Sequence, residues 1–257
     1  MDILRRELNA VYDRQRLGED VLDVQALALW RQRVAAMAVT GDEIDVITDA
    51  SADRCHIFTG RLGALLGIAD GPWMETEADS SDEDAVYARM HPEDLVDKRM
   101  LEYEYFKFVD PMPGNEKVLY KAVCRIRIMN REGRYLYVDN STQVLHPSEG
   151  GRIWLILCRY ALSANQAQAV GIDPFIVSPA GGEVRPFSFA ERRRHLLTER
   201  EKEVLRLVSA GRPSKQISDI LGISVNTVNR HRQNILEKLS VGNSVEAVTA
   251  ATAMRLL

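Results

Sequence analysis

The side chains with the clearest potential for chemistry lie between Ser224 and Leu239, where amide, hydroxyl and guanidinium groups recur at helical spacing. Asparagine and glutamine can each form two hydrogen bonds with adenine, and arginine can form two with guanine. Threonine and arginine can also hold a phosphate group. The only acidic residue of the stretch, Glu237, lies near its far end. The pattern predicts a surface that contacts double-stranded DNA through Asn226, Thr227, Asn229, Arg230, Arg232 and Gln233.

A first helix is predicted just before this stretch. Thr198 is a suitable N-cap, and Glu201 three residues later completes a capping box. Gly211 ends the helix because glycine adopts the left-handed conformation at low cost. Between these ends, apolar residues recur at helical spacing at Val204, Leu205, Leu207 and Val208.

Two further helices follow. The second opens at Pro213 and Ser214, and its expected buried face is Ile217, Ile220 and Leu221. After a turn at Gly222, Ser224 caps a third helix with the inward stripe Val228, Ile235 and Leu239. A short helix, a glycine-containing turn and a longer helix form the helix-turn-helix pattern, whose second helix enters the major groove. The competing interpretation is a charged helical bundle without a nucleic-acid role.

These residues resemble the LuxR-type DNA-binding domain of the NarL/FixJ class. The matching motifs are Leu197-Thr-Glu-Arg-Glu-x-Glu-Val-Leu205, Gly211, Lys215-Gln-Ile217, Leu221-Gly-Ile-Ser224, Thr227-Val228, His231 and Lys238-Leu239. Pro213 stands where that family usually has Ser or Thr, so the cap of the second helix is expected to shift by one residue. The resemblance implies that the third helix reads DNA. It adds Lys215, Ser224 and Lys238 to the candidate DNA-binding residues.

A fourth helix is predicted from the motif Asn243-Ser-x-Glu-Ala-Val248 onwards, and the resemblance implies that it mediates dimerisation. One stripe of this helix is Val245, Val248, Ala251 and Met254, and a second, of small residues, is Ala247, Ala250 and Ala253. Either the small residues allow close approach of a partner helix, or one stripe covers the core and the other faces solvent. We expect a homodimer on an inverted repeat, since a single domain offers few base contacts.

Charge is distributed unevenly along the chain. Residues 191–257 contain 12 Lys and Arg against 7 Asp and Glu, a net charge of +5. The whole chain carries −4, so the remaining residues carry −9. A basic terminal domain on an acidic body is the charge pattern of a protein that faces DNA with one domain only.

The composition indicates a globular protein, with 46% hydrophobic and 27% charged residues. No apolar run is long enough to span a membrane, and no signal peptide is expected. The three cysteines, Cys55, Cys124 and Cys158, have neither metal nor disulfide spacing. We therefore expect a cytoplasmic protein that has no membrane partner.

Residues 1–40 are predicted to form an N-terminal helical segment. Gly18 interrupts two apolar stripes, the first of Leu4, Leu8 and Val11 and the second of Leu27, Trp30, Val34 and Met37. The helix either packs on the domain that follows or serves as a dimerisation arm. The sequence leaves both interpretations open.

Residues 41–162 are predicted to form an α+β sensory or interaction domain. The expected elements are strands over 44–48 and 55–59, helices over 61–68 and from 91 to 109, and strands over 122–129, 135–146 and 153–162. The last strand is almost continuously apolar, so we expect it in the centre of the sheet. This order of elements, with His91-Pro-Glu-Asp94 and the turn Asn130-Arg-Glu-Gly-Arg134, is similar to a PAS domain. The resemblance implies that a small molecule or a partner binds between sheet and helices.

Several segments of this body are expected to be structural or solvated. The acidic stretch 70–84 is predicted to be a solvated loop, and the aromatic residues Tyr103, Tyr105, Phe106 and Phe108 are expected in the core. Cys55 lacks the flavin-binding motif of blue-light sensors. We expect His56 and His91 in turns or at the surface, although haem ligation stays open.

No enzyme is predicted, because the characteristic arrangements are missing from the sequence. The histidines His56, His91, His146, His195 and His231 lack metal-binding spacing. No nucleophile elbow or phosphate-binding loop occurs. The sequence assigns no cofactor.

Residues 163–190 are predicted to be a linker, because they are rich in Ala, Gly, Pro and Ser. Residues 191–257 then form the DNA-binding domain. The basic run Arg192-Arg-Arg194 at its start either contacts phosphate or is simply solvated.

The predicted function is that of a bacterial transcription regulator whose body senses a ligand or mediates dimerisation. The expected partners are double-stranded DNA, a second copy of the chain, RNA polymerase and a small molecule in the PAS-like domain. The alternative is a response regulator controlled by phosphorylation or by a partner protein. A receiver domain would alternate strands and helices from its first strand, whereas this chain begins with helices. A sigma-type polymerase subunit has a similar helical bundle but would need a different upstream domain.

Overall fold

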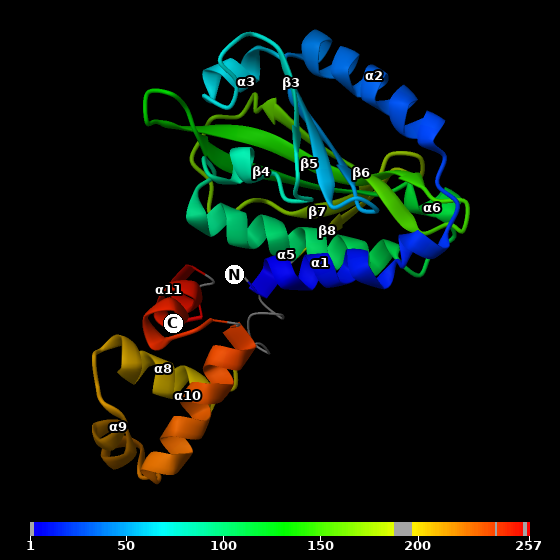
Figure 1. Cartoon of the computed structure of the whole chain (residues 1–257). Coiled ribbons are helices and arrows are strands. Elements are labelled where there is room, and N and C mark those ends of the chain that lie inside the picture. Colours follow the sequence, from blue (N-terminus) through cyan, green and yellow to red (C-terminus); the bar gives the residue numbers. More distant parts are fainter. Residues whose placement is uncertain (1–2, 188–196, 240, 254–255) are drawn as a thin grey trace. The chain divides into compact units, whose positions relative to one another are not determined.

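The computed structural model describes residues 3–187, 197–239, 241–253 and 256–257. The chain divides into two compact units, one of residues 8–187 and the other of residues 1–7 and 188–257. The first unit is built on an antiparallel sheet and the second is helical (Figure 1). The predicted α+β fold class is confirmed.

Two helices and a single 3-10 turn precede the sheet: α1 (Ile3–Arg14), η1 (Leu17–Glu19) and α2 (Val24–Gly41). The predicted interruption at Gly18 is therefore confirmed. Asp23 caps α2 by accepting hydrogen bonds from the backbone N–H groups of Gln25 and Ala26. Val34 and Ala38 of α2 are fully buried in a cluster with residues of the sheet. Of the two interpretations of this segment, packing on the following domain holds for α2.

The sheet has eight strands in the order β3-β2-β1-β6-β5-β4-β7-β8, and every adjacent pair is antiparallel. The central position predicted for the apolar strand β6 is confirmed, since it pairs with both β1 and β5. The strands are β1 (Ile44–Asp49), β2 (Arg54–Thr59), β3 (Met74–Ala78), β4 (Lys121–Met129), β5 (Tyr135–Pro147), β6 (Ile153–Leu162), β7 (Phe175–Ser178) and β8 (Glu183–Pro186).

Helices lie on both faces of the sheet (Figure 1). On one face α2 packs against β1 and β2, while α5 (Pro92–Val109) packs against β4 on the other. The even-numbered residues of β4, from Ala122 to Ile128, are buried on the α5 face, as their alternation predicts. Tyr105 and Phe106 of α5 are buried in this layer, which confirms their predicted core position. The shorter helices are α3 (Arg61–Leu65), α4 (Asp84–Tyr87) and α6 (Gly114–Lys117).

Two loop predictions were wrong. The predicted linker 163–190 contains β7 and β8, because Phe175–Ser178 pairs with the edge of β4 and Gly182, at a φ of 67°, lets the chain return as a hairpin. The predicted solvated loop 70–84 contains β3, which pairs with β2. Asp82 and Glu83, at its end, are buried rather than solvated, because cationic and hydroxyl side chains meet them inside the fold.

The second unit contains α8 (Glu199–Ser209), α9 (Ser214–Leu221), α10 (Val225–Leu239) and α11 (Ser244–Ala253). The capping box of Thr198 and Glu201 is confirmed, and Gly211 and Gly222 have positive φ as predicted. The N-cap of α9 is Pro213 itself, which offers no side-chain hydrogen bond, so the expected shift of the cap by one residue is not observed. The core contains Val204, Leu205, Ile217, Val228, Ile235 and Leu239.

Two predicted faces in this unit were wrong. Ile220 is 56% exposed and Ser218 is buried instead, because the inward side of α9 is set by Ile217 and its helical neighbours. On α11, Ala247 and Ala251 are buried whereas Val245 is 77% exposed. Small alanine side chains let α11 approach α8 and α10 closely, which leaves the larger valine outside. Met254 lies outside the described residues.

Candidate functional site

The exposed side of α10 carries the predicted DNA-reading residues. Asn226, Asn229, Arg230 and Gln233 are all exposed, and their spacing of three and four residues places them on one face of the helix. The opposite face, with Val228, packs in the core against α8 and α9. The structure thus brings these four predicted residues together in one polar stripe, which we call the α10 stripe.

Three of these side chains are available to a ligand. Within the residues that the structure describes, Asn226, Asn229 and Arg230 form no side-chain hydrogen bond or ion pair. Gln233 makes one long hydrogen bond of 3.5 Å to the carboxylate of Glu237. Amide and guanidinium groups left free on one helix face suit hydrogen bonds to base edges.

The start of α10 is held by its own cap. The Ser224 hydroxyl accepts a hydrogen bond from the backbone N–H of Thr227 at 3.1 Å, and the two hydroxyls are 2.9 Å apart. Both side chains are exposed. Ser224 and Thr227 therefore fix the first turn of the helix and still present their oxygens beside the α10 stripe.

Lys215 lies in the first turn of α9 and is exposed. Its ammonium group has no partner in the described part of the chain. Phosphate contact by Lys215 stays a prediction. The basic run Arg192-Arg-Arg194 lies outside the described residues.

The other two predicted DNA contacts are used inside the domain. Arg232 donates hydrogen bonds to the hydroxyl of Ser214 at 3.4 Å and of Ser244 at 2.8 Å, which connects α10 to the starts of α9 and α11. Lys238 Nζ lies 2.6 Å from Glu201 Oε2 on α8. Both cations therefore position α10 within the bundle.

One residue that the sequence analysis missed supports the turn of the motif. Arg200 of α8 donates to the backbone carbonyl of Leu221 at 2.7 Å. That carbonyl lies at the end of α9, where backbone acceptors lack helical partners. Arg200 thus stabilises the turn before α10. A single Arg in the first turn of a helix gives no local signal of such a long-range contact.

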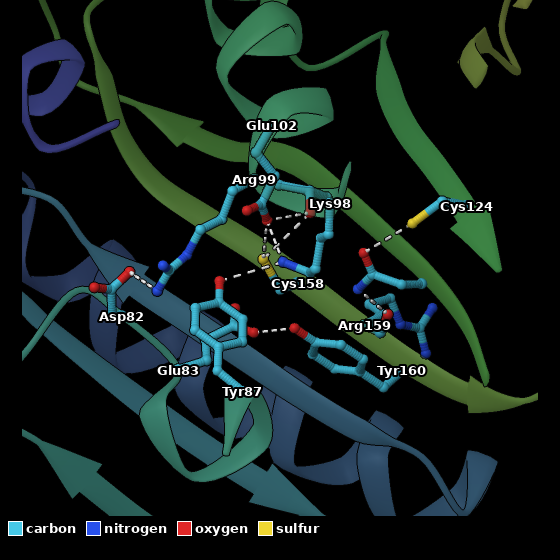
Figure 2. A network of polar contacts seen from close by, with 12 residues as sticks. Asp82, Glu83, Tyr87, Lys98, Arg99, Glu102, Cys124, Cys158, Arg159 and Tyr160 are labelled. Atoms are coloured by element: carbon cyan, nitrogen blue, oxygen red, sulfur yellow. Dashed lines mark hydrogen bonds and ion pairs between the residues drawn. The ribbon is translucent and has the colours of Figure 1, made fainter. Parts of the chain in front are cut away.

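The sheet unit contains a second polar cluster, which the sequence analysis also missed. Figure 2 shows it between α4, α5 and β6. Lys98 is fully buried, and its ammonium forms an ion pair with Glu102 and a hydrogen bond of 3.3 Å with the Tyr87 hydroxyl. The Tyr160 hydroxyl donates to Glu83, which is 1% exposed. We call these five residues, Glu83, Tyr87, Lys98, Glu102 and Tyr160, the buried polar network.

The sheet contributes further partners to this network. Thr142 of β5 donates to Glu102 at 3.0 Å, and the Cys158 thiol lies 3.8 Å from the same oxygen. Arg99 lies 4.0 Å from the Asp82 carboxylate and stacks over the Tyr87 ring at 5.1 Å (Figure 2). The network therefore joins both sides of the interface between α5 and the sheet.

The network contains two carboxylates and one ammonium. Burial raises the pKa of Glu83, and the neighbouring Glu102 carboxylate raises it further. Burial alone would lower the pKa of Lys98, but the Glu102 and Glu83 carboxylates outweigh it and hold that pKa above its ordinary value. Burial therefore disfavours the ionised form of Glu83 relative to water, and Lys98 forms its ion pair with Glu102. Burial also raises the pKa of Tyr87 and Tyr160.

His56 and His91, the two histidines considered as haem ligands, lie on β2 and at the N-cap of α5. His56 was expected in a turn or at the surface but is buried on β2, with its Nδ1 3.3 Å from the Glu77 carboxylate. Burial and the nearby Arg31 lower the pKa of His56. His91 caps α5 by accepting a hydrogen bond from the backbone N–H of Glu93, as expected of a turn residue. Within residues 3–187, 197–239, 241–253 and 256–257, no cluster of ligating side chains suits a metal ion.

The three cysteines are unpaired and buried. Burial raises the pKa of the Cys55 thiol to about 12, so this thiol stays protonated at neutral pH. No helix in the described ranges is long and apolar enough to cross a membrane.

Comparison with known proteins identifies the second unit. Residues 195–251 match the family "Bacterial regulatory proteins, luxR family". The transcriptional activator protein CarR of Pectobacterium carotovorum subsp. carotovorum is 52% identical over 64 residues, which are 25% of this chain and 26% of CarR. The transcriptional activator protein EsaR of Pantoea stewartii subsp. stewartii is 26% identical over 168 residues, which are 59% of this chain and 68% of EsaR.

The match to CarR spans about a quarter of that relative's length. A structure of the Vibrio cholerae VqmA dimer aligns with 92% of this chain and 89% of its own, at 17% identity. The TM-score of this alignment is 0.31. The match over residues 195–251 agrees with the capping box, the two glycine turns and the α10 stripe. The C-terminal domain of this chain is a helix-turn-helix domain of the LuxR family of bacterial regulatory proteins.

Proposed function

We propose that the protein is a transcription regulator that binds operator DNA as a homodimer through the α10 stripe. The observation that carries the proposal is the set of free amide and guanidinium groups of Asn226, Asn229 and Arg230 on the exposed face of α10. These groups suit adenine and guanine edges, while Lys215, Ser224 and Thr227 are placed to contact phosphate. We also propose that RNA polymerase is a partner of the protein and that the protein is located in the cytoplasm.

The sheet unit is proposed to be a PAS-like domain that controls the DNA-binding domain. Its strands β2-β1-β6-β5-β4 form a continuous antiparallel sheet with α5 across one face. The buried polar network lies beneath α5, where a small polar molecule could exchange hydrogen bonds with Lys98, Glu102 and Tyr87. A ligand that bound there would move α5 relative to the sheet and thereby bias the regulator.

Phosphorylation of a receiver domain is the weaker alternative. A receiver alternates strands and helices, and such crossovers produce parallel strands. The ladders of the described sheet are antiparallel throughout. Acetyl phosphate should therefore leave the mass of the protein and its DNA affinity unchanged. Control by a partner protein stays compatible with the same sheet.

The proposal is tested by selecting bound sites from random duplex DNA with the full chain. We expect an enriched inverted repeat whose half-sites are one helical turn apart. The triple variant Asn226→Ala, Asn229→Ala, Arg230→Ala should abolish the enrichment. Its matched control, Asp219→Ala on the exposed side of α9, should retain it. Equal enrichment with the triple variant would refute the proposed reading face.

A further inference from the structure

The face of the sheet opposite the buried polar network carries an open groove. Its floor is made of Val123, Ser141 and Ala161, small residues on the adjacent strands β4, β5 and β6. Ser141 and Thr142 are consecutive in β5 and so face opposite sides of the sheet, and Thr142 points to the network. The groove encloses 580 Å³, within the range of small-molecule sites.

One wall of the groove is the chain that follows β6. Gln166 fixes this segment by donating to the backbone carbonyl of Tyr137 at 2.8 Å and accepting from the N–H of the same residue at 3.0 Å. The carbonyl of Asn165 accepts a hydrogen bond from Arg125 at 2.8 Å. The carbonyl of Ile172 accepts one from the backbone N–H of Arg125 at 2.7 Å. The wall is therefore hydrogen-bonded to the sheet at both ends.

The groove is negatively charged at one end. Asp139 lies directly opposite Arg125 across the β4–β5 ladder. Asp173 is the residue after Ile172, whose carbonyl accepts the hydrogen bond from the Arg125 backbone N–H. The Arg125 guanidinium is turned away to the Tyr137 ring, 4.8 Å from its centroid, and to the Asn165 carbonyl. Among the described residues neither Asp139 nor Asp173 has an ion-pair partner. At this end of the groove, the carboxylates of Asp139 and Asp173 are therefore not paired with any cation in the described part of the chain.

The other end of the groove is positively charged. Lys121 lies four residues before Arg125 on β4, about 13 Å away at strand spacing. It forms no ion pair with any residue in the described ranges. Arg159, a third lining cation, is already paired with Glu43 and with Asp45. Between the charged ends lie the apolar side chains of Val123 and Phe175.

We propose that this groove binds a small zwitterion in the manner of a short peptide with free termini. Its ammonium group would lie at Asp139 and Asp173, its apolar body on Val123 and Phe175, and its carboxylate at Lys121. Three extended residues span about 10 Å, and the flexible lysine side chain covers the remainder. This site is separate from the buried polar network and adds a second ligand class to the sheet unit.

The test is a titration of the full ¹⁵N-labelled chain with trialanine, followed by amide chemical shifts. We expect saturable shifts at Val123, Ser141 and Ala161. N-acetyl-trialanine and trialanine amide each lack one terminal charge and should bind roughly threefold more weakly, as expected for loss of one exposed ion pair. Asp139→Asn and Lys121→Met should each weaken trialanine by a similar factor. Glu149→Gln, an exposed acid away from the groove, should have no effect.

Ser141→Leu provides a second variant, because the larger side chain fills the floor without changing a charge. This variant should abolish the chemical-shift changes caused by trialanine, while its other amide resonances remain those of a folded protein. The proposal is overturned if trialanine produces no saturable shift in the millimolar range. It is also overturned if the two blocked peptides bind as tightly as trialanine, or if the shifts appear around Thr142 instead of Ser141.

Discussion

Lys238 and Glu201 form an ion pair between α10 and α8, with Lys238 Nζ 2.6 Å from Glu201 Oε2. The same carboxylate accepts the backbone N–H of Thr198 in the capping box at 2.8 Å. Burial alone would raise the pKa of Glu201, but the hydrogen bonds from Lys238 and Thr198 outweigh it and hold that pKa below its ordinary value. Lys238, predicted as a DNA contact, thus joins α10 to the first helix of its domain.

Lys238→Ala should therefore destabilise the domain more than it weakens DNA binding. The expected loss is about 1 kcal/mol of unfolding free energy, because the ammonium is partly exposed while the carboxylate is buried. Amide hydrogen exchange of α10 in the full chain would measure it. Lys215→Ala is the matched control, since it removes an exposed lysine without a partner and should leave exchange unchanged.

Because the pKa of Glu201 is lowered in the folded state, its contribution to stability is present above the unfolded pKa of about 4.3 and is lost as pH falls through the folded value. The destabilisation by Glu201→Gln should accordingly shrink on acidification. Thermal unfolding at a series of pH values below about 5 would show it. A constant difference between the two proteins would mean that Glu201 is not stabilised as a carboxylate.

Arg230→Ala and Gln233→Ala should relax sequence preference. Each side chain lies on the α10 stripe, so its loss should cost about 1–3 kcal/mol at one base pair and little at the others. Lys215→Ala should instead weaken binding evenly across sequences. It should also reduce the slope of log affinity against log salt concentration by about one, because one phosphate contact is lost. Competition between operator variants at two salt concentrations separates the two outcomes. An unchanged preference with Arg230→Ala would place the reading face elsewhere.

The helix-turn-helix elements were predictable because their signals are local. Thr198 and Glu201 lie three residues apart, and Gly211 and Gly222 mark the ends of α8 and α9 by backbone conformation alone. The buried polar network gave no such signal. Glu83 and Tyr160 are 77 residues apart, and a carboxylate at the end of an acidic run looks solvated until its partner is known. Charged residues of α5 likewise resemble a wet helix face until the sheet covers them.

Lys98→Met should strongly destabilise the sheet unit. The substitution leaves the buried carboxylate of Glu102 without its ammonium partner, a loss of about 3–5 kcal/mol for a broken buried pair. All three tryptophans, Trp30, Trp73 and Trp154, lie in this unit, so denaturation followed by tryptophan fluorescence reports on it alone.

Glu83→Gln should cost the sheet unit little stability and should instead change how that stability depends on pH. The folded-state pKa of Glu83 is raised above its unfolded value, so the wild-type sheet unit gains stability as pH falls through the folded pKa and loses it as pH rises. Glutamine cannot titrate, and the variant should flatten this part of the pH profile at little cost. A pH profile identical to that of the wild type would exclude Glu83 as the group that binds the proton.

The exposed face of α11 is a candidate surface for assembly on DNA. Val245 is 77% exposed on α11, whereas Ala247, which was considered for close helix approach, and Ala251 of the Val245 stripe are both buried against the domain's own core. Val245, the half-buried Val248 and Pro213 line a groove of 420 Å³ between α11 and the start of α9.

If two copies meet through α11, Val245→Glu should weaken cooperative binding to an inverted repeat while affinity for a half-site stays unchanged. The reason is that two like charges would face each other across a two-fold axis. Thr252→Glu, an exposed substitution on the same helix, is the control for charge. Sedimentation of the full chain with whole-site and half-site DNA measures both quantities. Cooperative binding that survives Val245→Glu would assign dimerisation to the sheet unit or the N-terminal helices instead.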